Sequence, residues 1–207
     1  MSFIRKGNPM TQKQLVSKIL ALQARRKRCR ECLLWGKTTV VAELLYKKGD
    51  CDVLFMGINP GREEAKRGIP FCGPSGKILR STMADLDFTG INVAFSNAIL
   101  CSTSNERDIP GIPECIDHCN FLVMKVIQYL KPKVLVAVGR SCAQYVFNLN
   151  APITVISGTH QVWEFKGVQY PVIPIMHPAS LLYSPSDSGK RSFQRALREI
   201  KNTILNV

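Results

Sequence analysis

The cysteines of this 207-residue chain have the widest choice of chemistry, since a thiolate can hold a metal or act as a nucleophile. The eight are Cys29, Cys32, Cys51, Cys72, Cys101, Cys115, Cys119 and Cys142. The first ten residues lack the apolar stretch of a secretory signal, so we expect thiols or metal ligands and not disulfides. Only Cys29 and Cys32 have the C-x2-C spacing with which two thiolates bind one metal from a single turn. The other ligands of such a site must come from distant segments.

A second group of polar residues comes directly after apolar runs. The segment GINPG at residues 57–61 follows one run, Asn97 ends the next, and His177 follows a third. If these runs are parallel strands, their carboxyl ends meet at one edge of a sheet, where open α/β sheets bind ligands. We therefore expect the three segments to line one pocket. Each is a weak signal alone, because glycines around Asn-Pro also describe an ordinary turn.

The elements that would position these residues follow from hydrophobic periodicity. Short apolar runs lie at 52–56, 92–96, 133–138 and 171–176, and helical patterns lie between them at 76–86, 113–130 and 140–149. This order is typical of βαβ units, so we expect a fold of class α/β. A central, mostly parallel, four-stranded sheet would lie between two layers of helices, α/β/α, in one domain over 1–207. A turn at Gly167 suggests a hairpin, and a last amphipathic helix is expected at 188–204.

The N-terminal part of this domain, residues 11–32, is predicted to hold a helix and the first cysteines. The helix begins with the capping box T-x-x-Q at Thr11 and places Leu15, Ile19 and Leu22 on one face. Its cationic end, residues 25–28, leads directly into Cys29. This charge run could be solvated, could complement the helix dipole, or could contact phosphates.

The overall charge indicates a polyanionic partner. The chain has 28 Lys and Arg against 15 Asp and Glu, a net charge of +13. DNA or RNA is the leading candidate, although a basic surface can also serve solubility alone. Apolar residues make up 45% of the chain, and no apolar run approaches the ~18 residues of a membrane span, so disordered and membrane classes are poor fits. We expect a monomer of the cytoplasm or nucleoid.

The motifs in their order resemble a known family. GINPG continues as GINPGREEAKRGIPFCGPSGKIL, and SNAILC follows at 96–101 and MHPASLL at 176–182. Together they resemble the uracil-DNA glycosylase superfamily, in particular its iron–sulfur branch, the fourth family. The resemblance extends from Cys29 to the final helix.

The resemblance implies a [4Fe–4S] cluster held by Cys29, Cys32, Cys101 and Cys119. Cys119 is preferred over Cys115 because the following Asn-Phe-Leu is similar to the family's segment. Thiolates suit zinc as well as iron–sulfur clusters, but a zinc ribbon normally shows two tight C-x2-C pairs. The cysteines outside this set are expected to be buried or half-buried thiols.

The resemblance also implies roles in base excision, in which a flipped base is gripped while its glycosidic bond breaks. Phe71 would stack on the uracil, Asn97 would pair with its edge, and His177 would donate a hydrogen bond to O2 of the departing base. Substrate binding would further involve Gly57, Ile58, Ser180 and Leu181, with Leu181 or Leu182 as the wedge that fills the gap in the DNA. A core position is an ordinary alternative for Phe71 and for either leucine.

The first motif departs from the iron–sulfur branch, which usually reads G-E-x-P-G. Here the second position is Ile58, and Asn59 follows it, as in the mismatch-specific branch, where the Asn orients the attacking water. An amide cannot accept the proton of that water as a strong base, so Asn59 could only position it. A second departure is Tyr183, at a position where the family commonly has Arg.

The sequence thus predicts a monofunctional DNA glycosylase that hydrolyses the N-glycosidic bond of uracil in DNA and leaves an abasic site. Its catalytic residues would be Asn59 and His177. One alternative is a glycosylase for another altered base, such as hypoxanthine or a modified pyrimidine. Another is a non-catalytic DNA-binding relative.

Overall fold

The computed structural model describes residues 11–26, 29–46, 49–165 and 167–206 of the chain. The helices are α1 (Gln12–Arg26), α2 (Arg62–Arg67), α3 (Pro74–Asp85), α4 (Ile112–Leu130), α5 (Arg140–Phe147), α6 (Ile153–Ile156), α7 (Ser180–Tyr183) and α8 (Asp187–Leu205), with a 3-10 turn at Glu106–Asp108. The strands are β1 (Ala42–Leu44), β2 (Val53–Gly57), β3 (Val93–Asn97), β4 (Val134–Val138), β5 (Gln161–Phe165) and β6 (Val168–Ile175). No described helix is long and apolar enough to cross a membrane.

The sheet has the order β1-β3-β2-β4-β6-β5. Strands β3, β2, β4 and β6 are parallel, which confirms the four-stranded parallel core. The sheet is nevertheless six-stranded, because β1 and β5 pair antiparallel at its two edges. A strand of only three residues, such as β1, is too short to show a period of two in the sequence. The second arm of the expected hairpin and the fourth parallel strand are one continuous strand, β6.

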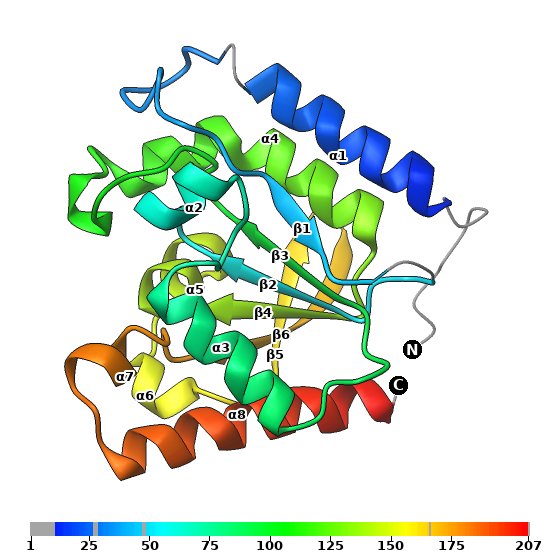
Figure 1. The fold of residues 1–207 in the computed structure, drawn as a ribbon, viewed down its shortest axis with the longest axis vertical. Coiled ribbons are helices and arrows are strands. Elements are labelled where there is room, and N and C mark those ends of the chain that lie inside the picture. The colour runs from blue at the N-terminus through cyan, green and yellow to red at the C-terminus, as the bar shows by residue number, and fades with distance from the viewer. Residues whose placement is uncertain (1–10, 27–28, 47–48, 166, 207) are drawn as a thin grey trace.

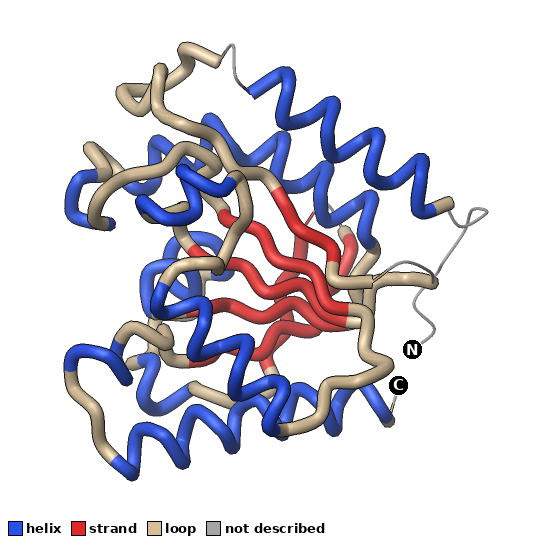
Figure 2. Tube along the Cα trace, in the orientation of Figure 1, coloured by secondary structure: helices blue, strands red, loops and turns tan. Residues whose placement is uncertain are grey.

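Helices cover both faces of the sheet, so the chain has the expected α/β/α layers (Figures 1 and 2). Apolar residues of α1, α4 and α5 pack in the core on one face, and residues of α3 and α8 pack in the core on the other. Every residue of β2, β3 and β4 is buried, as expected for parallel strands enclosed on both sides. Along β2, Leu54 and Met56 enter the first core, whereas Val53 and Phe55 enter the second.

The predicted start of α1 is confirmed in atomic detail. The backbone N–H of Gln14 donates to the Thr11 hydroxyl, and the Thr11 N–H donates to the Gln14 side chain at 2.9 Å, the two bonds of a capping box. The helix packs along α4 with Leu15, Ile19 and Leu22 buried. Two residues of the basic run, 27 and 28, lie outside the described residues.

Candidate active site

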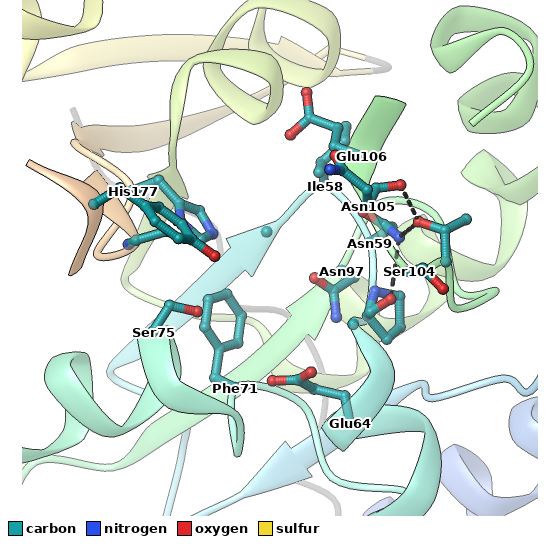
Figure 3. Close-up of a pocket in the computed structure, with 16 residues that line it drawn as sticks. Ile58, Asn59, Glu64, Phe71, Ser75, Asn97, Ser104, Asn105, Glu106 and His177 are labelled. Atoms are coloured by element: carbon teal, nitrogen blue, oxygen red, sulfur yellow. Dashed lines mark hydrogen bonds between the residues drawn. The ribbon is translucent and has the colours of Figure 1, made fainter. Parts of the chain in front are cut away.

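A cavity of about 400 Å³ lies at the carboxyl ends of the parallel strands. Its lining comes from residues 57–61, Phe71, Asn97, residues 103–106 and His177. The three segments expected to meet do so, because β2 and β3 are neighbours in the sheet and only β4 separates β2 from β6. Asn59 and Asn97 lie on one side of the cavity, opposite His177 and Phe71 (Figure 3). A cavity of this size, ringed by a few polar groups, is suited to a small aromatic ligand such as a base.

The amide of Asn59 has a fixed orientation. Its Nδ2 donates to the Thr103 hydroxyl at 2.7 Å and to the Pro60 carbonyl at 3.1 Å. The Thr103 hydroxyl donates its own hydrogen to the Asn105 carbonyl at 2.7 Å, so it must accept from Asn59. Both Nδ2 hydrogens are therefore engaged, and Oδ1 is the atom that remains to accept a hydrogen bond from water.

The imidazole of His177 is held in one tautomer. The backbone N–H of Ala179 donates to Nδ1 at 3.2 Å, so the neutral ring carries its hydrogen on Nε2. Burial lowers the pKa of His177, and the nearby carboxylates of Glu106 and Glu64 only partly oppose this effect. The ring is thus neutral at pH 7 and offers an N–H donor beside the cavity.

Gly139 makes room for this ring at the end of β4. A Cβ there would lie 3.2 Å from Cδ2 of His177, and the residue has φ of +91°, which side chains disfavour. Glycine is therefore required at this position both for the backbone conformation and for the approach of the imidazole.

Phe71 lies in the cavity wall in a strained conformation. It is buried, has φ of +52°, and packs on Phe95 with ring centroids 5.4 Å apart. Arg80 of α3 holds the turn, because its Nε donates to the Phe71 carbonyl at 2.8 Å and its guanidinium also donates to the Pro70 carbonyl. Glu43 of β1 pairs with the same guanidinium. Strain that surrounding contacts hold in this way is common at ligand sites.

The end of β2 approaches two of the ligand-binding candidates closely. A Cβ on Gly57 would lie 2.6 Å from Oδ1 of Asn97 and 2.9 Å from the Phe71 ring. The next residue, Ile58, is buried and lines the cavity at the position where the iron–sulfur branch usually has Glu. This part of the wall is therefore apolar.

Two carboxylates line the cavity from other segments. Glu64 of α2 accepts a hydrogen bond from the Gly73 N–H at 2.8 Å, and Glu106 contacts the Ser141 hydroxyl. Neither lies in the first motif. Both are close enough to act on the His177 pKa.

Two expected substrate-site residues, Ser180 and Leu181, do not line the cavity. The Ser180 hydroxyl instead donates to the His177 carbonyl at 2.8 Å and so closes the turn that follows β6. Leu181 packs against the core formed by α3 and α8. On the same short helix, Tyr183 is 85% exposed and does line the cavity, and Leu182 is 41% exposed.

Four cysteines lie close together where the loop after α1 meets the end of β3 and the start of α4. They are Cys32, Cys101, Cys115 and Cys119. The Cys115 thiol is hydrogen-bonded to that of Cys32 and has Cys119 and Cys101 as neighbours. Cys101, Cys115 and Cys119 are buried, whereas Cys29 and Cys32 are half-buried. Cys29 accepts a hydrogen bond from the Glu31 N–H at 3.4 Å.

These cysteines are suited to bind a metal centre, because thiolates are the ligands of iron–sulfur clusters and because the four side chains are neighbours. Among the described residues, no three His, Cys, Asp or Glu side chains are arranged in coordinating geometry. The structure thus brings the cysteines together without defining a ligand set. Burial raises the pKa of Cys51 to about 12 and also raises that of Cys142, and both thiols donate to backbone carbonyls, as expected of structural residues.

Sequence reasoning missed several residues that hold the site together, namely Thr103, Arg80, Gly139 and Glu106. Thr103 contacts Asn59 across 44 positions of the chain, and Arg80 reaches Glu43 across 37. A hydrogen bond over such separations leaves no local pattern. Only the glycine gave a signal, since it follows directly on a strand.

Comparison with known proteins agrees with this geometry. The family model described as "Uracil DNA glycosylase superfamily" matches residues 45–201. The type-4 uracil-DNA glycosylase of Archaeoglobus fulgidus is 35% identical over 162 residues, which cover 76% of this chain and 79% of the relative. That of Sulfurisphaera tokodaii is 33% identical over 164 residues, with 76% and 73% covered. That of Thermotoga maritima is 29% identical over 184 residues, with 87% and 91% covered. The chain belongs to the uracil DNA glycosylase superfamily, and its most similar relatives in this comparison include type-4 members.

Proposed function

We propose that this protein is a monofunctional uracil-DNA glycosylase that removes uracil from DNA and leaves an abasic site. The observation that carries the proposal is the pairing of two oriented groups, Oδ1 of Asn59 and the Nε2–H of neutral His177, at one cavity. One is an acceptor for water and the other is a donor for a developing anion. The curated relatives named as uracil-DNA glycosylases support the substrate.

The base would be bound before any bond breaks. The flipped uracil would stack on Phe71, and the Asn97 carboxamide would pair with its edge by giving and accepting a hydrogen bond. Gly57 and Ile58 would form the apolar wall beside it. Because these groups are held by the sheet and by Arg80, little ordering is needed on binding.

The reaction would then proceed through a cation-like sugar. The C1′–N1 bond breaks, and its electron pair leaves with the base, whose O2 receives the Nε2–H hydrogen bond of His177. Water held by Oδ1 of Asn59 adds to C1′ and releases its proton to solvent, since an amide is too weak a base to keep it. No lysine lies at a motif position for a Schiff base, so no strand cleavage is expected.

Contact with the DNA around the flipped base is assigned to α7. Leu182 is the exposed leucine of this helix, whereas Leu181 is half-buried against the core, so Leu182 is the better candidate for the wedge. Exposed Tyr183 at the cavity rim would lie beside it. The basic residues of α8 would supply phosphate contacts where the family has its Arg.

We further propose that Cys29, Cys32, Cys101 and Cys119 hold a [4Fe–4S] cluster. Three members of this set, Cys32, Cys101 and Cys119, are neighbours of the Cys115 thiol and so lie near one another, which supports a shared site, while the choice of Cys119 over Cys115 rests on the resemblance. The cluster would tie the loop after α1 to β3 and α4 and would contribute folding free energy. For this function we expect the protein in the cytoplasm, associated with the nucleoid.

A panel of duplexes tests the proposal. Each duplex carries one altered base, either uracil, hypoxanthine or a modified pyrimidine, and abasic sites are revealed by alkali after incubation with the protein. We expect cleavage at uracil. Cleavage only at another base would support the alternative that Ile58, in place of the branch's carboxylate, has changed the substrate. Binding of every duplex without any cleavage would support a non-catalytic relative.

A further inference from the structure

The loop after α1 carries an exposed indole that the fold does not use. Trp35 is 60% exposed, and neighbouring Leu33 is 78% exposed. The guanidinium of Arg30 lies over the indole, 5.8 Å from its centroid. An exposed aromatic face next to a cation is a surface for a planar or anionic ligand.

The loop presents this indole in an ordered way. The backbone N–H of Trp35 donates to the Cys32 carbonyl at 3.0 Å, and Leu34 between the two exposed side chains is buried. A ligand that stacks on Trp35 therefore meets a platform whose backbone is already fixed. Preorganisation of this kind lowers the entropic cost of binding.

The loop is also continuous with the wall of the cavity. The Ser102 N–H donates to the Thr38 carbonyl at 2.8 Å, and the next residue, Thr103, holds Asn59. In Figure 1 this loop, in blue, lies at the end of the molecule where β2 and β3 end. A strand of DNA bound at the cavity can thus pass over the same end of the protein.

The charge around the indole favours a nucleic acid. In the sequence, residues 25–37 contain six Lys and Arg and one acidic residue. A second exposed aromatic, Phe121 of α4, has Arg25 at 5.4 Å and Lys125 at 5.5 Å from its ring centroid. Aromatic faces interleaved with cations are the means by which proteins bind single strands, with bases on the rings and phosphates on the cations.

We propose that Trp35, with Arg30, is a stacking platform for an unpaired base of the DNA strand outside the cavity. The inference rests on the proposed function in that it takes DNA as the ligand. It adds a preference for DNA that is single-stranded next to the lesion, because bases inside a duplex have no free face for the indole.

The test is the equilibrium affinity for fluorescein-labelled DNA without uracil, measured by anisotropy for a single strand and for a blunt duplex of the same sequence. Trp35→Ala should weaken single-strand binding by roughly 5- to 150-fold, the usual effect of losing one stacked base, and change duplex binding by less than about twofold. Trp35→Phe keeps an aromatic face and should lie within about threefold of the parent. The matched control is Leu33→Ala, which removes an exposed apolar side chain of the same loop and should have no effect.

Several results would refute the proposal that Trp35 stacks on a base. The first is a Trp35→Ala variant that binds the single strand with the affinity of the parent. An equal loss for strand and duplex, or an equal loss in Leu33→Ala, would make the residue a support of the loop. Binding of an oligoglutamate peptide that depends on Trp35, with DNA affinity unchanged, would assign the surface to an acidic protein partner.

A separate assay, uracil excision, tests the proposed function. Uracil excision at saturating protein should be the same in the parent and in Trp35→Ala, since the indole lies outside the cavity. A parent that excises no uracil but loses single-strand affinity in Trp35→Ala would refute the glycosylase and leave the platform standing.

Discussion

The cavity and the cysteine group are built in different ways, although they are neighbours in the sequence. Only Ser102 separates Cys101 of the cysteine group from Thr103 of the cavity wall. In the cavity the two proposed catalytic side chains are each held by a second group, Asn59 by Thr103 and His177 by Ala179. In the cysteine group the thiols are neighbours, but no three of the described side chains have coordinating geometry. The cavity is thus shaped by the chain alone, whereas in the cysteine group the proposed cluster would join the thiols into one unit.

The largest effect of a single substitution is expected in the cysteine group. Cys119→Ser should remove the brown colour of the protein purified without oxygen and leave most of it insoluble, because ligation of distant segments contributes directly to folding. Iron, sulfide and visible absorbance are the measurements. Cys115→Ser is the matched control, one helical turn away and equally buried, and should keep the colour. Loss of the colour in the control alone would transfer the ligand role to Cys115, and stoichiometric zinc without iron would refute the cluster.

In the cavity, loss of either oriented group should affect chemistry and not docking. Asn59→Ala and His177→Ala should each lower the single-turnover rate of uracil excision by roughly 100- to 1000-fold, with DNA affinity within a few-fold of the parent. Asn59→Asp should keep or raise the rate once the Thr103 hydroxyl turns from the Asn105 carbonyl to donate to the new carboxylate, because a carboxylate can orient the water and also stabilise the sugar cation. Rates equal to the parent in both alanine variants would show that these residues are not catalytic.

A smaller effect is expected from the residue that orients Asn59. Thr103→Val is nearly isosteric but cannot accept the Nδ2 hydrogen bond, so the amide should turn and excision should slow by about tenfold. Thr103→Ser should restore most of the rate. In an Asn59→Ala background, Thr103→Val should have no further effect, as a double-mutant cycle would reveal. An equal tenfold loss in that background would make Thr103 a structural residue only.

The smallest effect is expected from the protonation of His177, which should make the free energy of unfolding depend on pH. Burial lowers its pKa in the folded protein, so below the ordinary value of about 6.5 the unfolded chain binds the extra proton more readily. The free energy of unfolding should therefore fall as the pH drops below that value and should gain nothing from this residue above it. Urea unfolding between about pH 8 and about pH 5 measures this, with His177→Gln as the variant that should lose the dependence. An identical pH profile in the variant would contradict the lowered pKa of His177.

Much of the fold could be predicted from the sequence, because buried parallel strands and amphipathic helices leave strong periodic patterns. The four parallel strands and the start of α1 are examples. Strand β1 could not be found, since its pairing with β3 depends on contacts across the chain and not on its three residues. The continuous β6 was divided in the prediction at Pro171, although the strand lies inside the sheet, paired with β4 on one side and β5 on the other. A proline such as Pro171 or Pro174 cannot donate a hydrogen bond to a neighbouring strand, so a run that contains it is a weak strand signal.

The place of a residue in the cavity was predictable where the residue lies at or just beyond the end of a strand, as with Asn59, Asn97 and His177. It was not predictable where orientation depends on a partner from another segment. Leu181 shows this limit, because whether a leucine of a short helix points to DNA or into the core depends on α3 and α8. Thr103 shows the opposite case, a residue outside the motifs that fixes the amide inside one.

The most direct test of the proposed catalytic site is the amount of free uracil released in a single turnover from a duplex with one uracil, measured by chromatography for the parent and for the Asn59→Ala/His177→Ala double variant. We expect one uracil per duplex from the parent, with a matching alkali-labile site, and release near background from the double variant at unchanged DNA affinity. A parent that binds this duplex and releases no uracil would refute the glycosylase, and a double variant that releases uracil at the parental rate would refute the two catalytic residues.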